Sequence, residues 1–366
     1  MKNSKVSTFR FDFRILSILL LVAVIPLLVG GWWFFRSYEN AYLELAGNDL
    51  SQAADTAVGV VSTYLSNQII QTAGLTDSPV LRAAVAQSNQ DLGKDLKVVR
   101  QELLKMEGDW PKLGPEDPRV RGILNNPASA FLRQYTRTVP AYREILVTDF
   151  LGRLVAASQK TSNYYQAAEE WWKETYGDGR RGSVYIGDIT FDESTSSHAL
   201  ELAQPFVDAE RGVVTGVIKV VLGAEAIHSL IGSFQAGVSG NALLLNDEGE
   251  VISALGYELM AQSPYPNTAE ILSAHSRGRR YFVSKSSPSA IYGLAQATMQ
   301  PQYPHLKWIV VTACPADVAL GPLLQMRRYF AFMVMAVILV GVLAALLISR
   351  VESRPAIIED AHLEKL

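Results

Sequence analysis

The sequence predicts an α+β protein in which two modules of similar plan follow a long N-terminal helix, with a membrane-spanning helix at either end of the chain. Two uncharged, mostly apolar stretches lie near the ends of the 366 residues, at 15–35 and 329–349. Between them, a helical pattern gives way to two blocks that each open with a β-hairpin. A chain of this length is long enough for two domains of ordinary size.

Composition excludes several classes of function. The chain carries 33 Lys and Arg against 36 Asp and Glu, a net charge of -3, so no overall basic field favours nucleic acid. The single cysteine excludes an intramolecular disulfide and a multi-cysteine metal site. The five histidines are scattered without ligand spacing, and the motifs of zinc proteases, α/β-hydrolases and P-loop proteins are missing. We therefore expect no cofactor and no resident metal, and find no catalytic motif.

The first apolar stretch predicts an uncleaved membrane anchor. Residues 1–14 are basic, and the following run is long enough to cross a bilayer at about 1.5 Å per residue. Trp32 and Trp33 stand at its far end, where aromatic belts lie. A cleaved signal peptide would have a shorter apolar core and small residues at its cleavage site. We predict a transmembrane helix at 15–36.

A second transmembrane helix is predicted at 329–349. Arg350 and Arg354 follow it, and the positive-inside rule then places both ends of the chain in the cytoplasm. Arg327 and Arg328 on the other side of the span weaken this charge count.

This topology predicts a two-pass protein of the cell (inner) membrane. Residues 37–326 would lie outside the cytoplasm, in the periplasm or the extracellular space. Residues 350–366 would form a short cytoplasmic tail.

The segment from Ser37 to about Gln87 has the pattern of one long amphipathic helix. Its apolar stripe is Leu50, Ala54, Ala57, Val61, Leu65 and Ile69. No proline lies between Pro26 and Pro79, so the helix is expected to continue the first span without a break. Such a helix often pairs with its copy in a dimer; alternatively, the stripe packs on its own domain. Residues 88–140 are weakly patterned, with helical pieces around a proline-rich loop.

Two β-hairpins open the two blocks. The first hairpin, at 144–158, turns at Asp149–Gly152, and the second, at 242–254, turns at Asn246–Gly249. The first block closes with strands at 198–208 and 212–222, and the second with strands at 281–287, 291–300 and 306–315. A helix at 223–234 would join two copies of one α+β unit, a distal module at about 140–232 and a proximal module at about 238–318. The acids at both turns are open to interpretation as metal ligands, although tight turns need Asp, Asn and Gly in any case.

Residues 163–192 gather aromatic and acidic side chains. The aromatic residues are Tyr164, Tyr165, Trp171, Trp172, Tyr176 and Tyr185, and the acids are Glu169, Glu170, Asp188 and Asp192. Ring faces attract cations and carboxylates orient them, so this composition suits a pocket for a polar or cationic organic ligand. The alternative is a helix whose aromatic residues are ordinary core and whose acids are solvated.

The whole layout resembles bacterial transmembrane receptors with an extracytoplasmic double Cache sensor domain. The resemblance covers about residues 15–350 and is carried by the first hairpin, the aromatic stretch, the segment VYIGDITFDEST, the strand GVVTGVIKVVL and KWIVV before the second span. It implies two tandem PAS-like (Cache) modules on one long helix, with the ligand in the distal module. The tail ISRVESRPAII is similar to the start of a HAMP linker, so we expect a truncated receptor or a sensor that signals through a separate protein.

The resemblance also implies a ligand site. The amino-acid-binding branch has Tyr, four residues, Arg, one residue, then Trp and an aromatic residue. Here Tyr164 is followed by Glu169, Trp171 and Trp172, so an acid stands where the family's Arg would meet a ligand carboxylate. A later family acid is missing at Val220 and Val221. These acids and tryptophans would suit an amine or quaternary ammonium ligand, and a neutral ligand remains an equal alternative. The predicted ligand-binding residues are Tyr164, Tyr165, Glu169, Trp171, Trp172, Tyr185, Asp188 and Asp192, one of each adjacent aromatic pair being structural.

The function expected from this layout is that of a membrane-bound sensory receptor, not an enzyme. Its partners would be a small-molecule ligand, a second copy of the chain, a cytoplasmic signalling protein and membrane lipid, with no nucleic acid. Two alternatives remain: a membrane-anchored extracytoplasmic enzyme in which the acids are catalytic, and a protein-binding module without ligand sensing.

Overall fold

The computed structural model describes residues 13–92, 95–232, 234–236, 240–254, 257–263, 267–284, 286, 289–296, 303 and 306–352. Residues 353–366, most of the predicted HAMP-like tail, and nearly all of the basic N-terminal flank lie outside the described residues. The chain divides into two units, Gly47–Cys314 and a terminal unit of Met1–Ala46 with Pro315–Leu366. Each unit is described by itself.

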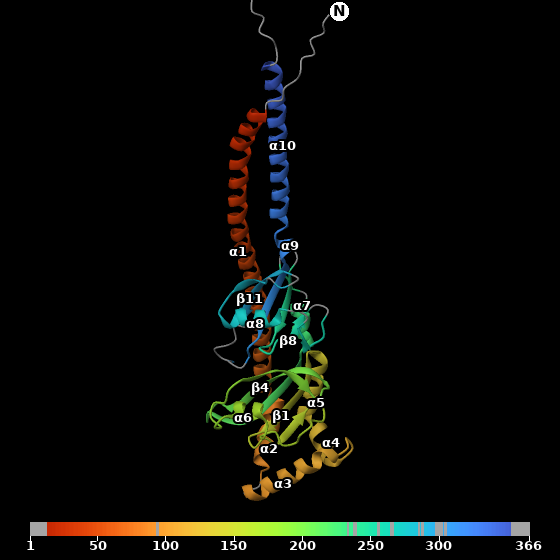
Figure 1. Ribbon diagram of the computed structural model, residues 1–366. Helices are drawn as coiled ribbons and strands as arrows, with labels where there is room; N and C mark the ends of the chain where they lie inside the picture. Colours follow the sequence, from red (N-terminus) through yellow and green to blue (C-terminus); the bar gives the residue numbers. More distant parts are fainter. Residues whose placement is uncertain are drawn as a thin grey trace, which may run out of the picture. The chain divides into compact units, whose positions relative to one another are not determined.

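The terminal unit contains the two predicted spans. It holds the start of α1 (Phe13–Thr76), then α9 (Ala316–Ala319) and α10 (Gly321–Glu352) (Figure 1). Two stretches, Leu21–Thr76 and Gly321–Leu347, are long and apolar enough to cross a membrane. The two helices touch where the rings of Phe35 and Phe330 meet edge to face, with centroids 5.3 Å apart.

Helix α1 runs without a break to Thr76, so the predicted continuity with the first span is confirmed. The predicted end near residue 87 is wrong, because the helix stops and α2 (Pro79–Gln90) begins. Ser78 is extended, with ψ of 122°, since the ring of a following proline disfavours the helical conformation. Proline then suits the first turn of the new helix, where its missing N–H has no partner to lose.

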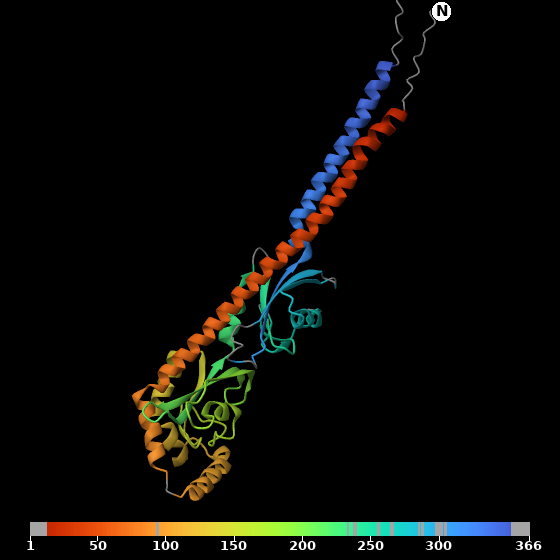
Figure 2. The same cartoon turned by 90° about the vertical axis from the view of Figure 1, so that its left-hand side faces the viewer.

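The apolar stripe of α1 packs on its own chain. Ala54, Ala57, Val61 and Leu65 are buried and share one hydrophobic core with residues of both sheets of the Gly47–Cys314 unit. This finding favours the second interpretation of the stripe, and any contact between copies would have to use another face of the helix. Figure 2 shows α1 passing along both sheets.

The first sheet has five antiparallel strands in the order β2-β1-β5-β4-β3. Its strands are β1 (Tyr142–Asp149), β2 (Leu154–Ala157), β3 (Tyr185–Asp192), β4 (Ser197–Asp208) and β5 (Val213–Gly223). The predicted hairpin and both predicted closing strands are confirmed. The weakly patterned region before the sheet folds as α3 (Leu96–Asp109), a 3₁₀ turn at Trp110–Lys112, α4 (Pro118–Leu124) and α5 (Pro127–Thr138).

Alternation along these strands gives the sheet two different faces. Ile145, Val147 and Ile218 point to the face that α1, α2 and α5 cover. Leu146 and Val217 point to the opposite face, where α6 (Glu170–Tyr176) packs through its tryptophans.

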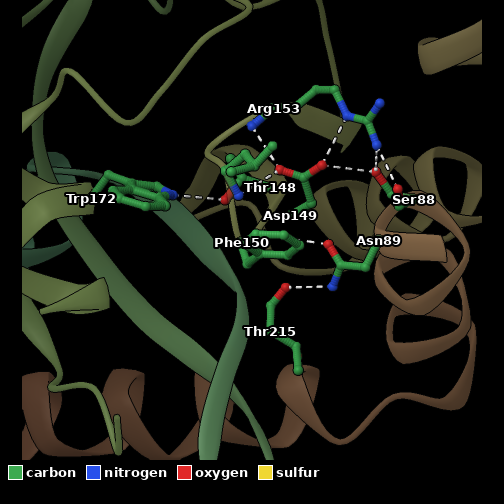
Figure 3. A network of polar contacts seen from close by, with 9 residues as sticks. Ser88, Asn89, Thr148, Asp149, Phe150, Arg153, Trp172 and Thr215 are labelled. Atoms are coloured by element: carbon green, nitrogen blue, oxygen red, sulfur yellow. Dashed lines mark hydrogen bonds and ion pairs between the residues drawn. The ribbon is translucent and has the colours of Figure 1, made fainter. Parts of the chain in front are cut away.

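The turn between β1 and β2 is fixed by Asp149, which is fully buried. Its carboxylate accepts from the backbone N–H groups of Leu151 and Arg153 at 3.0 and 2.9 Å, from Arg153 Nε at 2.8 Å and from Ser88 Oγ at 3.1 Å (Figure 3). These protein donors occupy the carboxylate, so the turn is a clasp that holds α2 to the first sheet. In the described part of the chain, no group of three or more His, Cys, Asp or Glu is placed to hold a metal ion.

The second sheet has seven strands in the order β10-β11-β12-β7-β8-β9, with β6 paired to β7. They are β6 (Gln235–Ala236), β7 (Gly240–Leu245), β8 (Glu250–Ala254), β9 (Ala261–Gln262), β10 (Tyr281–Ser284), β11 (Ala290–Gln296) and β12 (Ile309–Pro315). Helix α7 (Glu225–Gly232) packs on β7 and β8, and α8 (Thr268–Ser276) on β10. The outer ends of the strands predicted at 281–287 and 291–300 include residues that lie outside the described ones.

Helix α1 also packs closely against the second sheet. Thr312 Oγ1 donates to the carbonyl of Leu50 at 2.8 Å, and Ser51 Oγ donates to the carbonyl of Arg280 at 2.6 Å. A Cβ at Gly293 would overlap the backbone of Leu50, so this approach requires glycine.

Candidate functional site

A cavity of about 210 Å³ lies on the α6 face of the first sheet. Five carboxylates and one ammonium group line it: Glu144, Glu169, Asp192, Glu193, Glu201 and Lys219. The rest of the wall is mainly polar, from Thr161, Ser162, Asn163, Gln166, Thr190 and Ser194, with Leu146 and Phe191 as its apolar members. We call this space the acidic cavity.

Strand register brings the charged residues of the wall together. Glu144 and Leu146 are two residues apart and therefore point to the same face of β1. Leu146 stands opposite Lys219 on β5. Lys219 in turn stands opposite Ala203 on β4, two residues from Glu201. Three strands that are distant in sequence thus meet at one place in the sheet.

Lys219 is already engaged within the protein. Its Nζ lies 2.9 Å from Glu201 Oε1 and 5.1 Å from the centre of the Trp171 ring. The lysine side chain is 10% exposed, so this pairing is little weakened by solvent. Among the described residues, the other four carboxylates of the wall form no ion pair, and the acidic cavity therefore has an excess of negative charge that attracts cations.

Two carboxyl groups of the cavity have opposite pKa shifts. Burial raises the pKa of Glu144 above its ordinary value, against the opposing effects of a hydrogen bond from Gln159 and of the Lys219 charge. Burial would also raise the pKa of Asp192, but hydrogen bonds from Ser194 and from the Thr195 N–H, together with Lys219, lower it overall. Neighbouring acids whose surroundings separate their pKa values in this way are typical of functional sites.

The loop before α6 forms another wall of the cavity. Asn163 Nδ2 donates to Glu169 Oε1 at 2.9 Å, which fixes that carboxylate at the start of α6. Glu107 Oε2 accepts the backbone N–H groups of Tyr164 and Tyr165 at 2.8 and 2.7 Å and holds the loop from α3.

The structure brings together two of the eight predicted site residues, Glu169 and Asp192, in the acidic cavity. Trp171 and Trp172 are only 2% and 7% exposed, and neither lines the cavity. Trp172 stacks on Tyr176 with centroids 4.5 Å apart and donates its indole N–H to Thr148 Oγ1 at 3.0 Å. Both tryptophans are therefore core residues, and Trp171 contacts a residue of the cavity wall, Lys219, through its ring.

The other four predicted residues are dispersed. Tyr164 contacts Trp110 and lines a separate pocket of about 620 Å³, and Tyr165 lines another of about 390 Å³. Tyr185 is half-buried against the α6 core. Asp188 accepts a hydrogen bond from Trp308 at 2.7 Å. A ligand-binding role for each of the eight residues stays a prediction.

Sequence reasoning missed Glu144, Glu201 and Lys219. Each is a charged residue with apolar neighbours in a strand, in EILV, HALELA and GVIKVV. A charge in a buried strand is rare unless it is paired or functional, and this was the available signal.

No protein-family model matches the sequence, and no curated protein matches it. Solved structures do match. The ligand-binding domain of the Campylobacter jejuni chemoreceptor Tlp3 in complex with L-norvaline aligns with 76% of this chain and 94% of that chain, at 14% identity and a TM-score of 0.50. The sensory domain of Tlp3 with isoleucine bound aligns with 77% of this chain and 97% of that one, at 13% identity and a TM-score of 0.50.

The chain has the fold of a chemoreceptor sensory domain. This chemoreceptor sensory fold agrees with the resemblance drawn from the sequence, including the long N-terminal helix and the mixture of helices and antiparallel sheet. The two candidate spans on either side of it fit a transmembrane receptor.

Proposed function

We propose that this chain is a membrane-bound sensory receptor that binds a small cationic organic molecule in the acidic cavity. The observation that carries the proposal is the charge of that cavity, where five carboxyl groups, most of them ionised, face one ammonium group that is itself paired. The chemoreceptor sensory fold and the two candidate spans support a receptor over an anchored enzyme. The proposed activity is binding, with no bond made or broken.

The ligand class follows from which charges remain without a partner. A ligand ammonium would meet Asp192, Glu169 or Glu193, none of which forms an ion pair within the described part of the chain. A ligand carboxylate would find Lys219 alone, and Lys219 already pairs with Glu201. The Tlp3 structures hold norvaline and isoleucine, which carry both groups. We therefore propose an amine without a carboxylate as the preferred ligand.

The proposed topology places residues 37–326 outside the cytoplasm and both termini inside it, with spans at 15–36 and 329–349. The two sheets would be two PAS-like modules, a distal one at about 140–232 and a proximal one at about 238–318. The similar hairpins that open both sheets support this division into modules. The basic residues at 1–14 and after residue 349 support the topology.

Signal transmission would follow the chain from the second sheet into the second span. Strand β12 ends at Pro315 and the chain continues at once into α9 and α10. Ligand binding would shift the conformational equilibrium of this segment. The shift would pass to a second copy of the chain and to a cytoplasmic signalling protein. The outward face of α1 supports pairing with a copy, because Val60 and Ile70 are 36% and 68% exposed there and Gly59 has open space beside it.

The test is thermal unfolding of the full chain in lipid nanodiscs against amines, amino acids, organic acids and purines. A ligand at about 100 times its dissociation constant stabilises the folded state by about 2.7 kcal/mol. We expect a shift with amines that is lost in Asp192→Asn and kept in Glu210→Gln, an exposed acid that does not line the cavity. Shifts only with organic acids would contradict the ligand class, and no shift with any compound would contradict a small-molecule sensor.

A further inference from the structure

Glu144 and Asp192 meet at one hydroxyl group in the acidic cavity. Ser194 Oγ lies 2.6 Å from Asp192 Oδ1 and 2.9 Å from Glu144 Oε2. Both distances are those of hydrogen bonds. A serine hydroxyl, however, carries a single hydrogen and can donate it in one direction only.

Counting hydrogens assigns these two bonds. The shorter contact, to Asp192, takes the hydroxyl hydrogen, and Asp192 Oδ1 also accepts the Thr195 N–H at 2.8 Å, as an ionised carboxylate does. The contact between Ser194 Oγ and Glu144 Oε2 is then a hydrogen bond only if Glu144 supplies the hydrogen. Two ionised carboxylates would leave this pair of contacts one proton short.

The surroundings of Glu144 favour the neutral acid. Glu144 is 2% exposed, and besides Ser194 its only hydrogen-bond partner recorded among the described residues is Gln159 Nε2, at 3.0 Å. Burial without a cation of its own penalises the ionised form. The charged groups that line the cavity with it, from β5, β4, the end of β3 and the start of α6, are Lys219, Glu201, Asp192, Glu193 and Glu169.

Asp192 adds to the effect of burial on Glu144, and the Lys219 charge opposes it. Four of the five charged groups are acids that repel a further negative charge, and the one ammonium, on Lys219, is paired with Glu201. The upward shift in the pKa of Glu144 and the downward shift in the pKa of Asp192 agree with the proton count.

We propose that Glu144 holds a proton in the empty acidic cavity and releases it to water when a cationic ligand binds, so that pH sets the affinity of the receptor for amines. The inference rests on the proposed function. A ligand ammonium in the cavity supplies the positive charge that Glu144 lacks, which favours the carboxylate and lowers its pKa. Because binding then releases a proton, affinity rises with pH between the bound and free pKa values of Glu144, by up to about tenfold per pH unit.

The first arm of the test needs no ligand. Infrared difference spectra of the full chain in nanodiscs would compare wild type with Glu144→Gln at neutral pH. We expect wild type to show the C=O stretch of one protonated carboxylic acid that Glu144→Gln lacks and Glu210→Gln keeps. Loss of that band on titration to high pH would give the pKa directly. A wild-type spectrum without the band at neutral pH would overturn the inference, whatever the ligand is.

The second arm measures proton release on binding. Calorimetric titration with ethanolamine, putrescine and tetramethylammonium, in buffers of different ionisation enthalpy, gives the number of protons released. We expect up to one proton per amine bound in wild type and in Glu210→Gln, and none in Glu144→Gln, whose affinity would lose its rise with pH. Equal proton release in wild type and Glu144→Gln would overturn the linkage. If none of the three probes binds while the infrared band is present, the proposed ligand class fails but the protonated Glu144 stands.

Discussion

Trp308 donates its indole N–H to the carboxylate of Asp188 at 2.7 Å, and this bond joins the two sheets of the Gly47–Cys314 unit. Asp188 lies on β3, four residues before Asp192 of the acidic cavity, and Trp308 immediately precedes β12. The tryptophan is 1% exposed and Asp188 is half-buried. One strand therefore carries both a wall residue of the cavity and a contact to the segment that leads toward the second span.

We predict that Trp308→Phe lowers the free energy of unfolding by at least about 1.5–3 kcal/mol, the range for a hydrogen bond to a charged group. Trp308 is fully buried, so the cavity left by the smaller phenylalanine ring adds to the loss of the N–H donor. Denaturant unfolding of the Gly47–Cys314 unit within the full chain measures it. Lys307→Ala, which removes the neighbouring exposed pair with Asp247, is the control and is expected to change little. An unchanged midpoint in Trp308→Phe would contradict this role.

The same variant separates binding from transmission. Trp308 does not line the acidic cavity, so amine affinity is expected to stay near that of wild type. In wild type, amine binding is expected to slow hydrogen exchange of β12 amides, and Trp308→Phe is expected to reduce this protection. Equal protection of β12 in both proteins would show that Asp188 and Trp308 do not carry the ligand's effect.

Asp149→Ala is expected to destabilise the first sheet by about 3 kcal/mol. The change removes a fully buried acceptor and leaves the Arg153 guanidinium, with a side chain 22% exposed, without its charge partner. Asp77→Ala, which breaks the exposed pair with Arg82, is expected to cost about 0–1 kcal/mol. Chemical denaturation compares the two free energies of unfolding. Equal losses would show that the buried contacts of Asp149 stabilise the protein no more than an exposed ion pair does.

Glu144→Gln is expected to stabilise the ligand-free protein at neutral and higher pH. Burial raises the pKa of Glu144 in the folded state, so the folded protein binds this proton more tightly than the unfolded chain does. That contribution to stability is fully present below the ordinary glutamate value of 4.5 and is lost as pH rises through the folded-state pKa. The stability difference between Glu144→Gln and wild type should therefore grow from pH 4 to pH 8. A difference that stays constant with pH would contradict the raised pKa.

Gly293→Ala is expected to loosen the second sheet from α1. The added methyl group would overlap the backbone of Leu50, and helix backbone cannot move aside as a flexible side chain can. Gly108→Ala, in a helix position with open space around it, is expected to stabilise by about 0.5–1 kcal/mol. Thermal unfolding of both variants tests the close approach, and a neutral Gly293→Ala would argue against it.

Local pattern predicted several main elements of the fold. The two apolar runs, the unbroken helix from the first span and the hairpin at Asp149–Gly152 all follow from periodicity and turn chemistry. The end of α1 was misplaced because apolar spacing continues into α2, whereas Pro79 imposes a break.

The acidic cavity could not be predicted from local sequence pattern. Glu144, Glu201 and Lys219 come from three strands whose order in the sheet, β1-β5-β4, is not their order in the chain. Trp171 and Trp172 are adjacent in sequence, and an exposed helix would turn one of them to solvent. Both are buried because α6 is a short helix enclosed between the sheet and the preceding loop.

The central claim is that the acidic cavity selects a positive charge without a carboxylate. The most direct measurement is calorimetric binding of isoleucine and of 2-methylbutylamine, the same molecule without its carboxylate, to the full chain in nanodiscs. We predict that the amine binds more tightly than the amino acid, and that Asp192→Asn weakens amine binding while Glu210→Gln does not. Tighter binding of isoleucine would contradict the charge argument and show that Lys219 leaves Glu201 to meet a ligand carboxylate.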